Sequence, residues 1–164
     1  FSANAIARIK ARKRPVQSWF LDQSLVMSYW SGGAKRSYHH TAPVNTLYAL
    51  HESLRLLAAE GLQQSWQRHA DMHQLLKQGL TGLGLDFVVA EPYRLPQLNS
   101  VYIPAGVDDA AVRTQLLTQY NLEIGAGLGD LAGKAWRIGL MGYGARRENV
   151  ALCIKALEQV LRLP

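Results

Sequence analysis

The sequence predicts an α+β fold from Leu62 onward, with helices packed on one face of a mainly antiparallel sheet. Apolar residues recur there at helical spacing in three segments, and glycine and proline bound the short apolar runs between them, as is typical of strands. The predicted order is helix, strand, strand, helix, strand, strand, helix, which suits a two-layer domain. Because the preceding residues follow a different pattern, we divide the chain into 1–60 and 61–164.

The first segment is predicted to contain a basic helix and then a short one. Ser2 is placed to cap a helix through Arg14, and Asp22 to cap a helix through Trp30. An apolar residue directly before a cap is typical of the tail of a strand, and here that residue is Phe1. Because the chain opens in this way and not on methionine, we expect the natural protein to continue upstream.

A glycine-containing loop at 31–37, SGGAKRS, leads to a longer helix. Thr41 can cap this helix, Pro43 suits its first turn, and leucines at helical spacing continue it until Gly61. The elements that follow are a helix from Leu62 to about Leu80, strands at 85–90 and 98–104, a helix at 108–120 capped by Asp108, strands at 122–125 and 134–142, and a helix at 147–161.

Composition narrows the class of protein. Hydrophobic residues make up 48% of the 164, enough for a sizeable core, and the net charge of +6 is spread along the chain apart from the run Arg8 to Arg14. The single cysteine, Cys153, lies in an apolar helical pattern, which excludes a disulfide scaffold and favours a reducing, cytoplasmic compartment. No apolar stretch approaches the roughly 18 residues of a membrane span, so we expect no membrane partner.

Two histidine pairs raise the question of a metal site. His69 and His73 are four apart and share a helix face, but Ala70 stands where a zincin-type motif has glutamate, and no third ligand is evident. We interpret this pair as part of a solvated helix face. His39 and His40 are adjacent, and in extended chain their rings point to opposite sides, so one ion could hardly use both. The sequence therefore predicts no metal site.

The segment just before the long helix could instead bind an anion. The start of a helix presents free backbone N–H groups and the positive end of a dipole, and Tyr38 and Thr41 would add two hydroxyls. The alternative is a simple threonine cap beside a packed tyrosine. Spacing alone leaves both interpretations open.

The glycine-rich segment at 125–133, GAGLGDLAG, has Gly127, Gly129 and Ala132 at the spacing of a dinucleotide-binding fingerprint. That fingerprint needs a helix after the glycines, whereas a strand follows here, so we reject it and expect a mobile or tightly turned loop beside a cleft. The following strand carries Arg137 among apolar residues, where an unpaired guanidinium is costly. Arg137 therefore needs an anion, which can be an internal carboxylate or that of a substrate.

The basic run Arg8 to Arg14 makes nucleic-acid binding a further hypothesis. Its charges lie around several helix faces, and Trp19 and Phe20 fall beyond Pro15, so the sequence favours a solvated helix. We expect no nucleic-acid partner.

Three segments together resemble a known family: SYHHTAPVNTLYALHESLRLLAAEGL at 37–62, GLGDLAGKAWRIGLMG at 127–142, and RRENVALCIKALEQVL at 146–161. They are similar to the C-terminal part of class V aminotransferases, which are fold-type-I enzymes dependent on pyridoxal 5′-phosphate (PLP), and above all to the alanine–glyoxylate and serine–pyruvate group. The likeness covers essentially the whole chain. It implies that 1–60 is the C-terminal end of the large PLP-binding domain, including the interface helix, and 61–164 the small domain.

The resemblance also implies roles for particular residues. Tyr38 and Thr41 would reach across a homodimer interface to the cofactor phosphate of the other subunit, and Arg137 would hold the α-carboxylate of an amino or keto acid. The Schiff-base lysine of the family is expected upstream of Phe1. The lysines of this chain do not match it; they are Lys10, Lys13, Lys35, Lys77, Lys134 and Lys155. We therefore expect no catalytic residue here, and no transamination by this chain alone.

The reaction implied by the resemblance moves an amino group from alanine or serine to glyoxylate. A tyrosine followed by two histidines, Tyr38 to His40, favours the alanine–glyoxylate branch over serine–glyoxylate and ureidoglycine–glyoxylate enzymes. A hypothesis of another class is a non-catalytic module for dimerisation and substrate closure.

Overall fold

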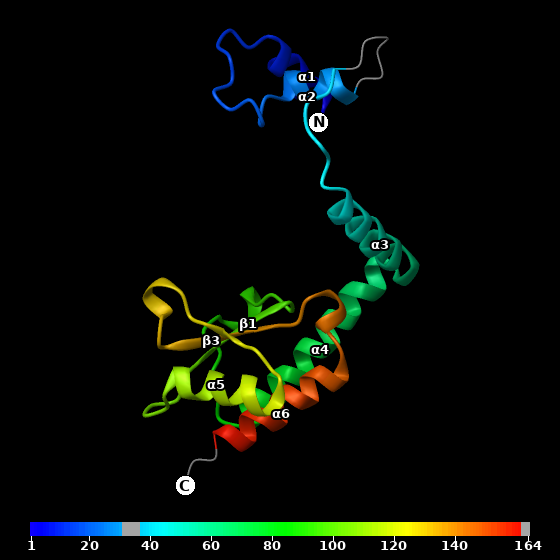
Figure 1. Cartoon of the computed structure of the whole chain (residues 1–164). Coiled ribbons are helices and arrows are strands. Elements are labelled where there is room, and N and C mark those ends of the chain that lie inside the picture. The colour runs from blue at the N-terminus through cyan, green and yellow to red at the C-terminus, as the bar shows by residue number, and fades with distance from the viewer. Residues whose placement is uncertain (31–36, 162–164) are drawn as a thin grey trace. The chain divides into compact units, whose positions relative to one another are not determined.

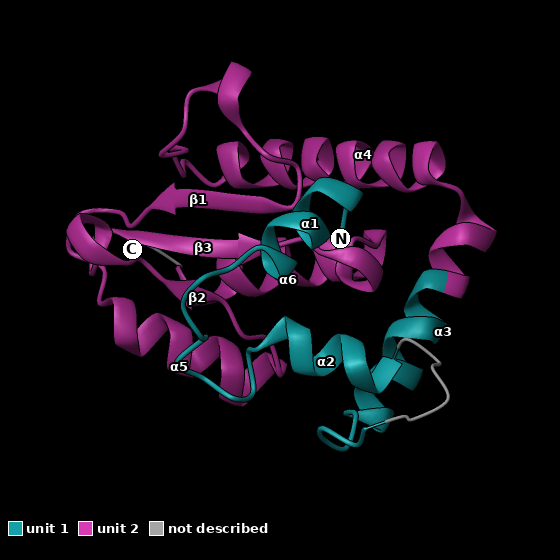
Figure 2. Cartoon of the chain, turned by 90° about the horizontal axis from the view of Figure 1, so that it is seen from above, with its two compact units in different colours: residues 1–54 teal, residues 55–164 magenta. Residues whose placement is uncertain are grey.

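The computed structural model describes residues 1–30 and 37–161 (Figure 1). Residues 31–36 of the predicted loop, which include Lys35, lie outside the described residues. The chain forms two compact units, residues 1–54 and 55–164 (Figure 2), and each is described by itself. The domain assignment of 1–60 and 61–164 stays a prediction.

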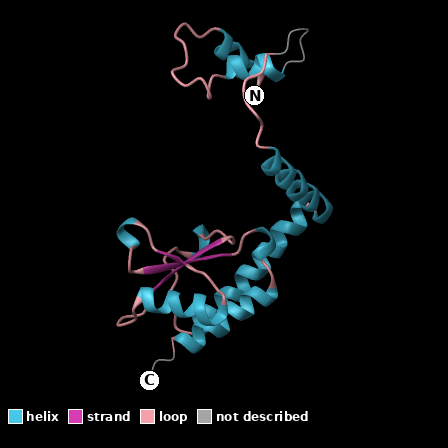
Figure 3. Cartoon of the chain, in the orientation of Figure 1, coloured by secondary structure: helices cyan, strands magenta, loops and turns pink. Residues whose placement is uncertain are grey.

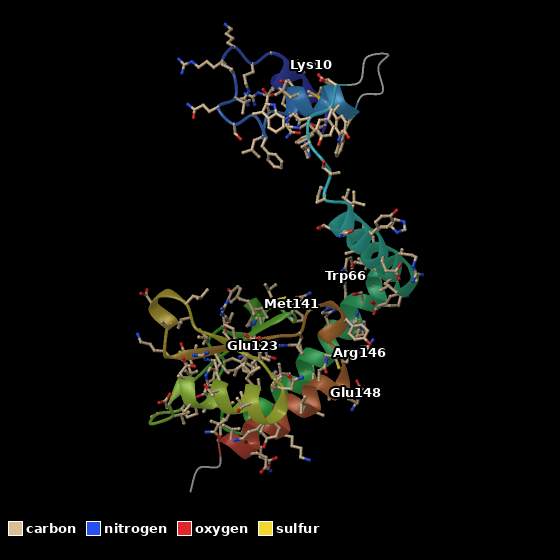
Figure 4. All side chains as sticks on the ribbon, in the orientation of Figure 1. Lys10, Trp66, Glu123, Met141, Arg146 and Glu148 are labelled. Carbon is tan, nitrogen blue, oxygen red and sulfur yellow. The ribbon has the colours of Figure 1, made fainter. Side chains whose placement is uncertain are left out.

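Two of the helices predicted in the first unit begin at the residues that the sequence indicated. Ser2 precedes α1 (Ala3–Lys10), and its hydroxyl accepts the N–H of Ala5. Asp22 precedes α2 (Gln23–Trp30), and its carboxylate accepts the N–H of Ser24 at 2.9 Å. The predicted extension of α1 to Arg14 is wrong: the helix ends at Lys10, labelled in Figure 4, ahead of a turn and Pro15.

The third helix, α3 (Val44–Glu60), begins later than predicted. Thr41 does not cap it, because the Thr41 hydroxyl lies 2.7 Å from the hydroxyl of Tyr38. The first helical hydrogen bond joins the N–H of Leu47 to the carbonyl of Pro43. The segment from Tyr38 to Thr41 therefore precedes the helix as a separate, irregular stretch.

The second unit holds the predicted α+β domain. Its sheet has the order β1-β3-β2, and both pairs of strands are antiparallel. The elements are α4 (Leu62–Gly82), η1 (Glu91–Tyr93), β1 (Leu98–Tyr102), α5 (Asp109–Tyr120), β2 (Gly125–Ala126), η2 (Gly129–Leu131), β3 (Ala135–Gly139), η3 (Gly142–Gly144) and α6 (Arg147–Val160). The fold class predicted from the sequence is confirmed.

Helices α4, α5 and α6 lie on one face of this sheet (Figures 1 and 3). Successive side chains along each strand point alternately toward these helices and toward the opposite face. Val101 and Trp136 face each other in register and are fully buried in the same core cluster as Leu76, Leu80, Leu116 and Leu157 of the helices. Arg137 is the next residue along β3, so its side chain projects from the opposite face, across from Ser100 and Gly125.

All four predicted strands differ from the observed ones. The strand predicted at 98–104 ends earlier, at Tyr102. Residues 85–90 make only an isolated bridge, between Phe87 and Val101, because the chain turns away into η1. The strand predicted at 122–125 shifts to 125–126, since Ile124 is drawn into the core. The strand predicted at 134–142 pairs only over 135–139.

Asp109, at the start of α5, ties that helix to the sheet. Its carboxylate accepts hydrogen bonds from Arg113 Nε at 2.7 Å and from the indole N–H of Trp136 at 2.9 Å. The hydrogen bond from Arg113, supported by that from Trp136, holds the pKa of Asp109 below its usual value. The ionised carboxylate thus satisfies the one polar group of a fully buried indole.

The Asp109 contacts predict a pH-dependent contribution to stability. A carboxyl group whose pKa is lowered by folding stabilises the fold above its unfolded pKa, about 3.9, and this contribution is lost as the pH falls through the folded pKa. Asp109→Asn should therefore lower the free energy of unfolding by about 1 kcal/mol at pH 7. Urea unfolding followed by tryptophan fluorescence should show this difference shrinking as the pH falls below about 3.9 and through the folded pKa. A pH-independent difference would contradict the role of the ionised group.

Candidate functional site

Tyr38 and Thr41 form an exposed pair of hydroxyls. Their oxygens are 2.7 Å apart, and the ring of Tyr38 is steadied by edge contact with Tyr29, with ring centroids 5.6 Å apart. The Tyr38 side chain is 68% exposed. One of these hydroxyls donates to the other, and the remaining O–H is free to donate to an oxygen of an anion such as a phosphate. This geometry fits the phosphate-binding role that the resemblance implies.

The two histidines between these hydroxyls do not point apart, contrary to the expectation from extended chain. Their Nδ1 atoms are 2.6 Å apart, because the His39 ring stacks on Trp19 and its Nε2 lies 3.0 Å from the Trp19 carbonyl. A carbonyl only accepts, so Nε2 of His39 carries a proton, and in the neutral pair His40 donates to Nδ1 of His39. His39, which is 5% exposed, thereby anchors the segment.

Arg137 occupies the face of the sheet away from the helices. It is half-buried, and its Nε donates to the carbonyl of Ala126 at 2.7 Å. The described residues include ion pairs of Arg68 with Glu60, Lys77 with Glu91, and Arg113 with Asp109, and Arg137 is in none of these. In that part of the chain Arg137 therefore has no acidic partner. Of the two anions that the sequence left open, an internal carboxylate is not found at Arg137 among the described residues.

The glycine-rich segment is a tight turn that leads into β3. A Cβ at Gly127 would lie 2.0 Å from the carbonyl oxygen of Leu131, so a side chain there would collide with the backbone. A 3₁₀ turn, η2, and then β3 follow the glycines, which agrees with the rejection of a dinucleotide-binding fingerprint.

Comparisons with known proteins agree with this geometry. The chain is 42% identical to the alanine–glyoxylate aminotransferase of Felis catus over 164 residues, covering 99% of this chain and 40% of that protein. It is 41% identical to the (S)-ureidoglycine–glyoxylate transaminase of Bacillus subtilis, covering 90% of this chain and 35% of that protein. The crystal structure of an alanine–glyoxylate aminotransferase from Nostoc sp. matches with a TM-score of 0.90 and 51% identity, covering 99% of this chain and 42% of that one. The chain belongs to the class V aminotransferase family.

No protein-family model matches this aminotransferase chain. It spans about two-fifths of the length of the curated alanine–glyoxylate aminotransferases that it matches. The resemblance to the C-terminal portion of the family, inferred from three segments of sequence, is confirmed. The roles of Tyr38, Thr41 and Arg137 stay proposals, because these comparisons concern whole chains and not single residues.

The prediction that His69 and His73 lie on a solvated helix face is wrong for this aminotransferase chain. They are 7% and 6% exposed. His73 Nδ1 lies 2.6 Å from the side-chain oxygen of Asn99, which is itself buried. A signal was present in the sequence: the two histidines continue the helical stripe of Leu76 and Leu80, which form the core.

Arg68 and His69 together hold the turn that follows β3. His69 Nε2 accepts the N–H of Gly142 at 3.0 Å, and Arg68 donates to the Gly142 carbonyl at 2.7 Å. Arg68 also pairs with Glu60, and this hydrogen bond lowers the pKa of the Glu60 carboxyl. Figure 4 labels Met141 and Arg146 on either side of this turn. Sequence reasoning missed this clamp, since it joins residues far apart in the chain.

Other predicted features of the chain can be located. Within residues 1–30 and 37–161, no group of three or more histidine, cysteine, aspartate or glutamate side chains is arranged to hold a metal ion. The charged residues of the run from Arg8 to Arg14 are exposed, but only Arg8 and Lys10 lie on a helix, because α1 ends at Lys10. Cys153 is buried, and burial raises the pKa of its thiol to about 12. None of the described helices is both long enough and apolar enough to cross a bilayer.

The buried His69 predicts a loss of stability on substitution. His69→Phe keeps the aromatic volume but leaves the Gly142 N–H without its acceptor, and it removes the side-chain hydrogen bond from His69 Nδ1 to the Ser65 carbonyl, 2.6 Å away. We expect a decrease of about 1–3 kcal/mol in the free energy of unfolding, measured by urea denaturation. The control His51→Phe, at an exposed position of α3, should change it by less than about 0.5 kcal/mol. Equal effects of the two variants would refute the clamp.

Proposed function

We propose that the protein to which this chain belongs is a PLP-dependent aminotransferase that transfers an amino group from alanine or serine to glyoxylate. Arg137 carries this proposal. It is a half-buried guanidinium on the face of the sheet opposite α4, α5 and α6, with no acidic partner in the described part of the chain. The names of two relatives support glyoxylate as the acceptor of the amino group, because both the Felis catus and the Bacillus subtilis proteins are named for glyoxylate.

In this proposal Arg137 orients the substrate. A planar guanidinium binds a carboxylate through two parallel hydrogen bonds, which fixes both the position and the rotation of the ligand. Each α-amino and α-keto acid in the cycle carries such a carboxylate, so one residue serves both halves of the reaction. Holding the reacting carbon in one orientation reduces the entropic part of the barrier.

Tyr38 and Thr41 would hold the cofactor phosphate of the partner subunit in a homodimer. When bound, PLP supplies the electron sink that stabilises negative charge at the α-carbon of the substrate. The two hydroxyl oxygens lie 2.7 Å apart, so one donates to the other and one O–H is left to donate to the phosphate. The contact of His39 with the Trp19 carbonyl holds this segment in place. The proton-transferring lysine that this chemistry requires is proposed to come from a segment outside the present sequence.

Two finer assignments belong to the same proposal. The preference for alanine over ureidoglycine rests on the Tyr38-His39-His40 run, and both kinds of relative match to a similar degree. A cytoplasmic location is supported by the single, buried cysteine of the sequence, Cys153. A non-catalytic role in dimerisation and substrate closure is the alternative for this chain taken alone.

Replacing Arg137 tests the carboxylate-binding role in the complete enzyme. Arg137→Gln should raise KM for every α-carboxylate substrate by about 10- to 150-fold, the equivalent of a charge-assisted contact of roughly 1.5–3 kcal/mol. Arg147→Gln is the matched control, because Arg147 is exposed at the start of α6. Steady-state kinetics that leave Arg137→Gln with the KM of the parent enzyme would rule out the assignment.

Removing one hydroxyl tests the cofactor contact. Tyr38→Phe should weaken PLP binding by roughly 5- to 10-fold, because a hydrogen bond contributes about 1 kcal/mol. It should leave the affinity for pyridoxal, which lacks the phosphate, unchanged. Tyr48→Phe removes a hydroxyl from another exposed tyrosine, in α3, and should alter neither affinity. If Tyr38→Phe weakened PLP and pyridoxal equally, Tyr38 would not be a phosphate ligand.

A further inference from the structure

Gly125 lies directly across the sheet from Arg137, and nothing in its backbone requires glycine. The two residues are Cα partners in the β2–β3 pair. Gly125 is absent from the glycines whose φ is positive. Glycine weakens a strand, and within a strand it often marks a place where a ligand approaches closely. The presence of glycine at position 125 therefore needs another explanation.

A side chain at position 125 would lie against the side of the Arg137 guanidinium. A Cβ built on Gly125 would lie 3.3 Å from Nη2 of Arg137 and 3.5 Å from its Nε. Nη2 would have to shift, since 3.3 Å is tighter than an ordinary van der Waals contact. Gly139 behaves differently, although it lies on the same strand and face as Arg137. A Cβ there would meet only the end of Met141, at 3.9 Å.

The same pair of strands determines which edge of the guanidinium is available. Nε of Arg137 donates to the Ala126 carbonyl at 2.7 Å, so the edge formed by Nε and Nη2 is already engaged. A carboxylate can then form two parallel hydrogen bonds only with Nη1 and Nη2, at the end of the guanidinium. A side chain at Gly125 would crowd Nη2, one of these two nitrogens.

We propose that Gly125 is a specificity-determining position that keeps the end of the Arg137 guanidinium open to a carboxylate, with Ala126 fixing its orientation. The ligand class is a carboxylate that docks end-on to Nη1 and Nη2. This inference rests on the proposed function of Arg137 and adds the direction of binding and the residue that permits it.

A graded substitution series in the complete enzyme tests this role. Gly125→Ala should raise KM for α-carboxylate substrates by about tenfold and Gly125→Val by more, while kcat changes less than about twofold. Alanine and valine favour strands over glycine, so loss of strand propensity is not a competing cause. The matched control Gly139→Ala should keep the KM of the parent enzyme. An unchanged KM in both Gly125 variants would overturn the proposal.

A binding measurement on the unsubstituted chain remains informative even if a variant fails to fold. With ¹⁵N-labelled arginine, titration with acetate should shift the Nη resonances of Arg137 and leave its Nε–H protected by Ala126. Acetamide, a neutral molecule of the same shape, should shift neither. An acetate-dependent loss of Nε–H protection would show side-on binding and contradict the inference.

The outcomes separate this inference from the proposed function. If acetate shifts the Arg137 resonances and Arg137→Gln raises KM, but Gly125→Val does not, Arg137 binds the carboxylate without help from Gly125. If acetate shifts no Arg137 resonance and Arg137→Gln leaves KM unchanged, the carboxylate role of Arg137 fails, and the role of Gly125 fails with it.

Discussion

The alternation of side chains along β3 is the constraint on which the second unit depends. Trp136 is fully buried against the helices, and Arg137 projects from the other face of the sheet. Because successive residues of a strand point to opposite faces, a register slip of one residue would bury the guanidinium and expose the indole. Both outcomes are costly, so the core and the candidate ligand site hold the strand in the same register.

The polar side chains of interest are oriented mainly by backbone groups. Arg137 donates to the carbonyl of Ala126, and His39 to that of Trp19, while His69 bridges the backbone of Ser65 and Gly142. A backbone carbonyl fixes the direction of a guanidinium without neutralising its charge. Arg137 is thereby held in place and keeps its full attraction for an anion, which an internal carboxylate would have removed.

The two units contribute different parts of the chemistry proposed for this family member. The first unit offers paired hydroxyls suited to a phosphate, and the second offers a guanidinium suited to a carboxylate. Neither set is sufficient for transamination, which needs a cofactor and a lysine to move protons. The chain matches about two-fifths of the length of its relatives, as it does with the Nostoc sp. structure. This coverage agrees with a chain that holds one portion of such a site.

The sequence by itself determined the fold class, the order of the helices, the caps at Ser2, Asp22 and Asp108, and the family. These depend on local periodicity, short-range hydrogen bonds and motifs, which the chain order contains directly. Only the tertiary structure decided the burial of His69, the approach of His39 to His40, and the absence of an acidic partner for Arg137 among the described residues. Burial and hydrogen-bond partners depend on residues distant in sequence, so no local pattern could supply them.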